Sequence, residues 1–298
     1  MSELYNAQLS RHLQKIEESL PAYLPDLSDA RSVVTRAMAY ACEAGGKRLR
    51  PVLTLEFCRL ARGEPDKALP FAAAVECIHS YSLVHDDLPC MDNSPLRRGK
   101  PSVHAAFGED MALLAGDALL NAAFEIMLCE QNRAGLPDDR VLAAAAALAR
   151  QAGVLGMVGG QALDLYSEGR TITLAELETL QRGKTAALLI AACEMGCHIG
   201  GGDAVMLAAA RTFGLHLGLC FQIVDDILDV TSTAEKLGKP TGSDDENGKT
   251  TYVSLLGLEE ARRLAAERTQ KAVEALTPFG DDADGLRALA RALLTRDR

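Results

Sequence analysis

Two aspartate-rich clusters, each embedded in a strongly apolar stretch, constrain this chain more than any other feature of its sequence. The first reads HDDLPCMD over residues 85–92, and the second reads QIVDDILD over residues 222–229. Ionised carboxylates beside apolar packing raise their own pKa values or destabilise the fold, unless cations lie between them. Magnesium is bound by one or two carboxylates together with substrate phosphates. The clusters therefore predict two acidic sites that face each other and hold magnesium ions and a polyphosphate.

The remainder of the sequence favours helices. Ala and Leu dominate the 298 residues, Trp is absent, and runs of β-branched residues are scarce. We find no alternating strand pattern, no Pro- or Ser-rich linker and no internal repeat. We therefore expect one all-α domain over residues 1–298.

Prolines, glycines and caps delimit the expected helices. They cover residues 3–20, 31–44, 51–60, 68–87, 111–131, 139–165 with an interruption near 156–160, 173–200, 203–231, 252–276 and 281–294. Pro21 and Pro25 end the first of them. Thr173 and Glu176 form a capping box at the start of another. Gly183, within that same pattern, predicts a break that aims the next two residues into a cavity.

Helix geometry groups the first cluster. His79 and Asp86 are seven residues apart, so they share a helix face to within about 20°. Pro89 disfavours helix at the residue before it and lacks a donor. We therefore expect Asp92 on a loop that folds back toward Asp86. In the second cluster, Asp225 and Asp229 share a face at i, i+4.

Cationic segments accompany both clusters. GGKRLRP at 45–51 combines glycines, cations and a helix start, which favour an anion. RRGK at 97–100 follows the first cluster, and the polar segment 237–250 follows the second. Cations of this kind suit the outer oxygens of a diphosphate. Taken alone, each segment is equally compatible with a solvated loop.

Charge, cysteines and hydropathy exclude several classes. A net charge of −10 argues against a nucleic-acid binder. Eight cysteines without a CxxC pair predict buried thiols in a reducing compartment rather than a zinc site. The first twenty residues lack a signal-peptide core, and the longest apolar runs, 141–149 and 186–193, are short of a membrane span. We expect a soluble cytoplasmic protein without a membrane span.

Two alternative classes fit less well. Glu76 and His79 match the Glu-x-x-His element of di-iron bundles, but those bundles need the element twice and it occurs once here. A non-catalytic subunit of a helical enzyme complex would need neither acidic cluster, and this chain has both. One such cluster is weak support for an enzyme; two with cations behind them are much stronger.

The motifs GGKRLRP, HDDLPCMD, RRGKP, GKT and FQIVDDILD stand in the order found in short-chain trans-prenyl diphosphate synthases. The chain resembles this family from about residue 41 to 251. It is most similar to the bacterial farnesyl diphosphate synthases, which share the longer spacing of its first aspartate cluster. The resemblance implies an all-helical barrel of the isoprenoid synthase type with a deep central cavity, usually a homodimer. Terpene cyclases share that fold but usually lack GGKRxRP, RRGKP and a second complete cluster.

The resemblance also implies roles for individual residues. Three magnesium ions per site would be held by Asp86, Asp92, Asp225 and Asp229, with Asp87 and Asp226 nearby. The isopentenyl diphosphate site would comprise Lys47, Arg50, His79 and Arg98. The allylic diphosphate site would comprise Arg97, Lys184, Thr185, Gln222, Lys239 and Lys249.

The implied reaction condenses isopentenyl diphosphate with dimethylallyl or geranyl diphosphate. Magnesium and the cations assist departure of the allylic diphosphate, the isopentenyl double bond attacks, and a proton is lost, with the released diphosphate as its acceptor. Thr185 and Gln222 offer partial negative charge to the carbocation. No side chain stands out as a protein base.

Product length in this family depends on bulk just before the first aspartate cluster. Tyr81 lies five positions before Asp86 and Ser82 four before. A large residue at the former position implies a cavity floor and a farnesyl product. Helix geometry supports this only loosely, because Tyr81 points about 140° away from Asp86. A geranylgeranyl product, with Tyr81 as an ordinary core residue, stays the alternative.

Overall fold

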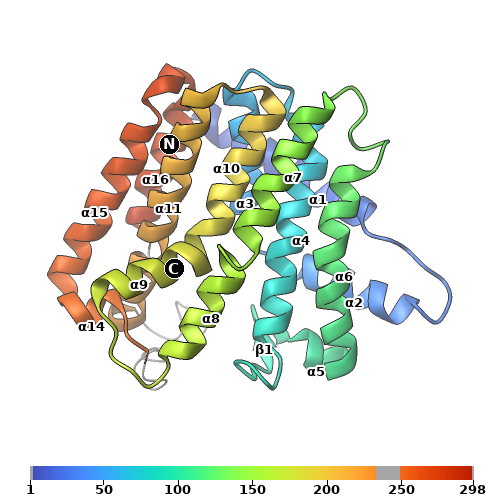
Figure 1. The fold of residues 1–298 in the computed structure, drawn as a ribbon, viewed down its shortest axis with the longest axis horizontal. Coiled ribbons are helices and arrows are strands. Elements are labelled where there is room, and N and C mark those ends of the chain that lie inside the picture. Colours follow the sequence, from blue (N-terminus) through green and yellow to red (C-terminus); the bar gives the residue numbers. More distant parts are fainter. Residues whose placement is uncertain (1–2, 233–248, 297–298) are drawn as a thin grey trace.

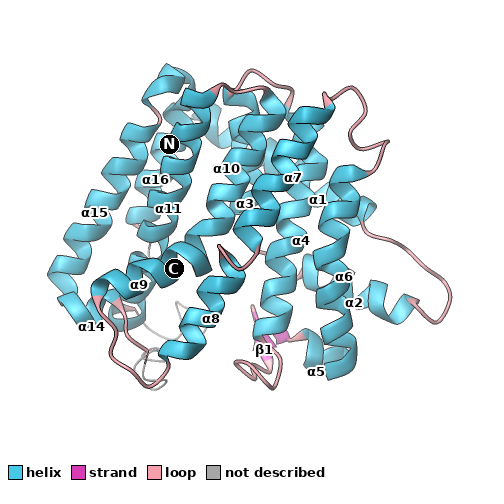
Figure 2. Cartoon of the chain, in the orientation of Figure 1, coloured by secondary structure: helices cyan, strands magenta, loops and turns pink. Residues whose placement is uncertain are grey.

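The computed structural model describes residues 3–232 and 249–296, which form an almost entirely helical fold (Figures 1 and 2). The α-helices are α1 Glu3–Tyr23, α2 Ser32–Glu43, α3 Leu49–Leu60, α4 Leu69–Asp86, α5 Val103–Phe107, α6 Glu109–Leu128, α7 Asp138–Ala152, α8 Met157–Ser167, α9 Leu174–Gln181, α10 Ala187–Gly200, α11 Ala204–Thr231, α14 Tyr252–Leu256, α15 Leu258–Ala275 and α16 Asp284–Leu294. The 3₁₀ segments are Pro65–Ala68 and Thr277–Ala283, and Arg182–Ala186 is π-helical. The two-residue strands β1 Leu96–Arg97 and β2 Lys100–Pro101 pair antiparallel. The predicted all-α class is confirmed.

Some helix boundaries differ from the predictions. The first helix continues past Pro21 to Tyr23, because a proline in a last turn removes only one intrahelical donor. Gly257 adopts a positive φ of 79° and divides the predicted 252–276 helix into α14 and α15. The short α5 was not predicted, since its five residues are too few to show periodicity.

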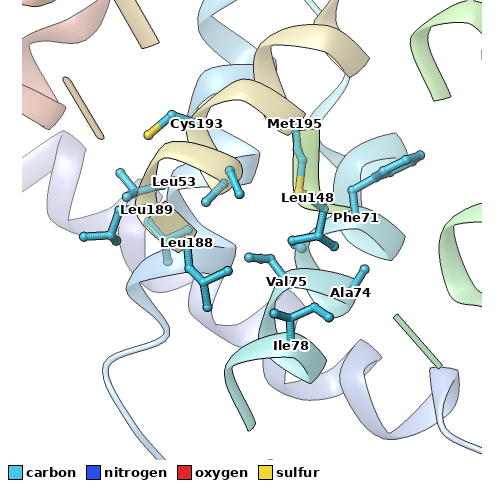
Figure 3. Close-up of a cluster of buried hydrophobic side chains, with 14 of the residues drawn as sticks. Leu53, Phe71, Ala74, Val75, Ile78, Leu148, Leu188, Leu189, Cys193 and Met195 are labelled. Atoms are coloured by element: carbon cyan, nitrogen blue, oxygen red, sulfur yellow. The ribbon is translucent and has the colours of Figure 1, made fainter. Parts of the chain in front are cut away.

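The main core lies where α3, α4, α7 and α10 pack together (Figure 3). Leu53, Phe71 and Leu148 are buried there against Val75 and Met195. A small residue lets α10 cross α3 closely, because a Cβ on Gly196 would come within 2.1 Å of the Thr54 carbonyl oxygen. This core fixes α4, whose last residue begins the first acidic pair.

The packing brings the two acidic clusters to the same side of the molecule. In Figure 1 the C-terminal ends of α4 and α11 both lie in the lower half, near β1 and the α8–α9 pair. Near the end of the chain, Arg296 returns to this region and donates to Asp225 of α11. Segments more than 200 residues apart in sequence therefore meet around one site.

Length and composition alone would allow three helical stretches of the described chain to cross a membrane. They are Glu109–Leu128, Asp138–Ser167 and Ala204–Thr231. The prediction of no membrane span rested on uninterrupted apolar runs and is not confirmed by this broader criterion. Only 39–44% of each apolar window is buried inside the fold, so the outer faces of these helices carry exposed apolar surface.

All eight cysteines are free thiols, but the prediction that they are buried is only partly correct. Cys90 is exposed and Cys129 is half-buried, whereas the other six are buried. Burial raises the pKa of Cys58 and of Cys197 to about 12, so these two thiols are inert as nucleophiles at neutral pH.

Candidate active site

A cavity of about 950 Å³ opens between the loop before α3 and helices α4, α8, α11 and α16. Its apolar wall includes Met157 and Leu165 of α8 and Leu289 and Leu293 of α16. Ten of the residues singled out in the sequence line it: Lys47, Arg50, His79, Tyr81, Ser82, Asp86, Arg98, Lys184, Thr185 and Gln222. The predicted deep cavity is thus present, and it is large enough for a drug-sized ligand.

The first acidic cluster has the predicted turn. Asp86 closes α4, and the backbone N–H of Asp92 donates to the Asp86 carbonyl oxygen at 2.9 Å, so the loop does fold back. Burial raises the pKa of Asp86 to about 6, with Lys184 pulling it down and the Asp92 charge pushing it up. An acid whose ionised form is this costly favours a cation beside it.

Asp87 and Arg97 pair with each other. Arg97 Nε donates to Asp87 Oδ2 at 3.1 Å, and its Nη2 lies 2.5 Å from Oδ1. Asp87 is 2% exposed, and neither residue lines the main cavity. In this geometry Asp87 anchors the β1–β2 hairpin to the end of α4. The proposed role of Arg97 on the allylic diphosphate stays a prediction.

The aspartates of the second cluster lie in different environments. Arg296 Nη2 lies 2.5 Å from Asp225 Oδ1, and its guanidinium stacks 3.9 Å from the Phe221 ring centroid. Asp226 is 3% exposed; its Oδ2 accepts the Tyr252 backbone N–H at 2.8 Å. Asp229 is also buried. Asp225 is therefore the most accessible carboxylate of the three, and Asp226 ties α11 to α14.

The predicted break at Gly183 is a π-helical turn, Arg182–Ala186, between α9 and α10. It packs tightly on α8, because a Cβ on Gly160 would lie 2.0 Å from the Lys184 backbone nitrogen. The turn aims two side chains at the cavity, as predicted. Lys184 Nζ donates to Asp164 Oδ2 at 2.6 Å, and the Thr185 hydroxyl lies 3.1 Å from Gln222 Oε1.

Gln222 links this turn to the second acidic cluster. Its Nε2 donates to Asp226 Oδ1 at 2.9 Å. Its Oε1 lies 3.1 Å from the Thr185 hydroxyl, which is equally close to the amide oxygen of Gln181. Because the Thr185 proton is directed at an amide oxygen, the hydroxyl oxygen keeps lone pairs that can face the cavity. A half-buried oxygen that is held by hydrogen bonds suits a developing positive charge.

The three cations of the basic loop all line the cavity, and Arg48 is also paired within the fold. Arg48 adopts a positive φ of 45°, and its 1%-exposed side chain bonds to Glu17 at 2.7 Å and to Glu76 at 2.6 Å. Glu76, which the di-iron alternative required as a metal ligand, is thus held by an arginine. Lys47 and Arg50 line the cavity together with Arg48 and Glu76.

Two arginines and a histidine converge at one end of the cavity. Burial, then repulsion from Arg50 and Arg98, holds the pKa of His79 well below its usual value, so its imidazole is neutral. Burial likewise lowers the pKa of Arg50 to about 10, and its Nε has no hydrogen-bond partner. A Cβ on Gly46 would lie 2.7 Å from the Arg98 guanidinium, and the φ of 138° at this position favours glycine. The arrangement favours an anionic ligand.

Sequence reasoning missed Asp164 and Gln161 on α8. Asp164 accepts from Lys184 and lies 3.5 Å from Lys249 Nζ. A smaller pocket of about 120 Å³ joins Asp164, Lys249 and Asp226, and it shares Lys184 and Gln222 with the main cavity. Gln161 lines the main cavity with a buried Nε2 that has no partner. The signal was the i, i+3 spacing of these two polar residues after a glycine pair.

Lys239 lies outside the described residues, so its predicted role is not addressed by the geometry. Within residues 3–232 and 249–296, no three His, Cys, Asp or Glu side chains are already gathered as a metal site. The donors are nevertheless suited to magnesium, since they are carboxylate oxygens. Asp86 lines the main cavity and Asp226 lines the smaller pocket, and the two spaces share Lys184 and Gln222. Phosphate oxygens and water would have to complete the coordination.

Comparison with known proteins agrees with this architecture. Residues 31–284 match the family model described as polyprenyl synthetase. The chain is 44% identical to the farnesyl diphosphate synthase of Geobacillus stearothermophilus, over 97% of both chains. It is 47% identical to a chloroplastic geranylgeranyl pyrophosphate synthase of Capsicum annuum, over 89% of this chain and 72% of that one.

Solved structures give the same result. An FPP/GFPP synthase from Zymomonas mobilis superposes with a TM-score of 0.88 at 39% identity, covering 99% of this chain and 100% of that one. A Helicobacter pylori geranyltransferase complexed with magnesium and isoprenyl diphosphate superposes with a TM-score of 0.85 at 34% identity, covering 99% and 97%. The chain therefore belongs to the polyprenyl synthetase family and is a trans-prenyl diphosphate synthase, a prenyltransferase.

Proposed function

We propose that this prenyltransferase condenses isopentenyl diphosphate with dimethylallyl and then geranyl diphosphate, and that its main product is farnesyl diphosphate. The observation that carries the product length is Tyr81, which lines the cavity although only 7% of it is exposed. A bulky ring at that place closes the cavity one helical turn from the first acidic cluster.

The substrates would bind at opposite ends of the polar lining. Lys47, Arg50 and Arg98, with the neutral His79 as a hydrogen-bond donor, would hold the isopentenyl diphosphate. Lys184 and Lys249 would hold the allylic diphosphate, with Asp164 positioning both ammonium groups. The farnesyl diphosphate synthase relative and the geranyltransferase complexed with magnesium and isoprenyl diphosphate support diphosphate substrates. The division of the residues between the two substrates follows the family resemblance.

Three magnesium ions, held by Asp86, Asp92, Asp225 and Asp229 together with the allylic diphosphate, would neutralise charge on the leaving group. The apolar wall of α8 and α16 would exclude water from the allylic cation. The Thr185 hydroxyl and the Gln222 amide oxygen, fixed by their mutual hydrogen bond, would stabilise that cation. The released diphosphate would accept the proton.

Tyr81→Ala tests the product length. We expect the variant to turn over and to shift its main product from fifteen carbons to twenty or more, because Cys77, Ala74 and Ala73 behind Tyr81 are small. Products would be identified by mass after removal of the diphosphate. Tyr81→Phe, which retains the ring, is the control. An unchanged fifteen-carbon product would make Tyr81 an ordinary core residue.

A geranylgeranyl product is the second candidate, favoured by the similarity to the Capsicum annuum enzyme. A wild-type product of twenty carbons would establish it, without affecting the assignment of the chemistry. A non-catalytic subunit would yield no product with either allylic starter.

We further propose that the protein is a cytoplasmic homodimer. Leu113, Leu114, Leu120 and Leu128 on α6 are between 36% and 49% exposed, which is an apolar surface that a second copy could cover. Its eight free thiols suit a reducing compartment. Light scattering of the purified protein would test the dimeric state. Fractionation of cells that produce the protein would test the cytoplasmic location.

A further inference from the structure

Tyr81 does not close the cavity by itself, because His85 lies beside it. The two residues are one helical turn apart on α4, and both line the cavity. Their rings meet edge to face, with centroids 5.7 Å apart and planes at 79°. An aromatic contact of this kind stabilises both ring positions. The orientation of His85 therefore affects how much of the cavity Tyr81 closes.

His85 is held from the opposite side by α6, which packs along α4 (Figure 1). Its Nε2 lies 3.1 Å from the Leu113 carbonyl oxygen and 4.0 Å from Asp117 Oδ1. The ring thus rests against the backbone of α6 where it lines the cavity.

The ring can rest there only because residue 116 is a glycine. A Cβ at this position would lie 2.0 Å from His85 Nε2, 2.3 Å from Cδ2 and 2.8 Å from Cε1. Those distances are far inside van der Waals contact, so any side chain would displace the ring. Glycine within a helix costs about 1 kcal/mol relative to alanine, and this buried contact is a physical reason for its presence in α6.

We propose that Gly116 is a positioning residue that sets the depth of the prenyl cavity. Because Gly116 lacks a Cβ, the His85 ring can pack directly against α6. In that position the ring contacts Tyr81 edge to face and holds it in place. This inference rests on the proposed function. A methyl group at position 116 would push the imidazole toward Tyr81 and the cavity, leaving less room for a growing chain.

Gly116→Ala is the first test, with geranyl diphosphate, isopentenyl diphosphate and magnesium as substrates. We expect the yield of the fifteen-carbon product from geranyl diphosphate to fall at least tenfold, while condensation with dimethylallyl diphosphate to ten carbons persists. The ratio of products is the readout, because a purely structural loss would lower both condensations together. Gly153→Ala, at the end of α7 and outside the cavity, is the matched control.

The His85→Ala change in the Gly116→Ala background is the second test. Removing the imidazole vacates the space that the new methyl needs, so we expect fifteen-carbon synthesis to return and the melting temperature to rise above that of the single glycine variant. This recovery of stability does not depend on catalysis. The melting temperatures therefore test the contact between residue 116 and His85 even if the wild type has no condensation activity. An inactive wild type would refute only the proposed function.

Two results would overturn the inference. One is a ratio of fifteen-carbon to ten-carbon product that is the same for Gly116→Ala, Gly153→Ala and the wild type. That result would mean that the displaced His85 ring turns to solvent rather than toward the cavity. The other is a double variant that is no more stable than Gly116→Ala, which would mean that the methyl does not contact His85.

Discussion

His79 reports on the electrostatics of the cationic end of the cavity. Its pKa is depressed by burial and by nearby arginines, so the native state binds fewer protons than the unfolded chain below about pH 6.5. Stability should therefore be present above that pH and should be lost as the pH falls below it, by up to about 1.4 kcal/mol per pH unit. His79→Gln should remove this part of the pH dependence.

Urea denaturation at pH 7.5 and 5.5 measures the effect. The free energy of unfolding should drop more for the wild type than for His79→Gln between the two pH values. His104→Gln, outside the cavity, is the control and should follow the wild type. A His79→Gln variant with the wild-type pH dependence would contradict the buried, neutral imidazole.

The neighbouring aspartates 225 and 226 should respond differently to alanine. Asp226→Ala leaves the buried Tyr252 N–H without its acceptor, so we expect a loss of about 2–3 kcal/mol in the free energy of unfolding. The Asp225 side chain is 39% exposed and paired with Arg296, so Asp225→Ala should cost no more than about 1 kcal/mol. Chemical denaturation of both variants without metal decides this. Equal losses would show that Asp226 has no special structural role.

The π-helical turn is the element on which the allylic side of the site depends. Gly160→Ala would place a Cβ 2.0 Å from the Lys184 nitrogen, so α8 and the turn must separate. We expect stability to fall by about 1–3 kcal/mol and turnover by roughly 100-fold, since a displacement of about 1 Å can cost that much. Gly153→Ala is again the control. A Gly160→Ala variant with wild-type turnover would show that the turn tolerates displacement.

The elements that carry strong local signals were predicted correctly. The Thr173 capping box is present, and the break at Gly183 is present. The continuation of α1 through Pro21 and the division at Gly257 were not predicted, because a proline or a glycine near a helix end weakens helical geometry without dictating whether it stops.

At the scale of the whole molecule, the sequence predicted which residues gather but not how they pair. Arg48 with Glu76, and Asp226 with the backbone of Tyr252, are separated by 28 and 26 residues. Such partners depend on how whole helices pack, which no local pattern encodes. Motif spacing therefore identified ten residues of the cavity lining, whereas the structure was needed to show that Asp87 lies outside it and that Arg48 is held by Glu17 and Glu76.

Magnesium and diphosphate should stabilise the whole fold only when both are present. Inorganic pyrophosphate would bridge the two acidic clusters through the metal, and a ligand at about 100 times its Kd adds roughly 2.7 kcal/mol of stability. Thermal denaturation should show a rise in Tm with the two together and little with either alone. Asp86→Ala should abolish the rise. A pyrophosphate effect that persists in this variant would place the metal elsewhere.

The measurement that tests the central claim most directly is product analysis of the purified protein with isopentenyl diphosphate, dimethylallyl diphosphate and magnesium. We predict a dominant fifteen-carbon alcohol after removal of the diphosphate, and no product when magnesium is chelated. The absence of any condensed product, with dimethylallyl or with geranyl diphosphate as the starter, would contradict the account.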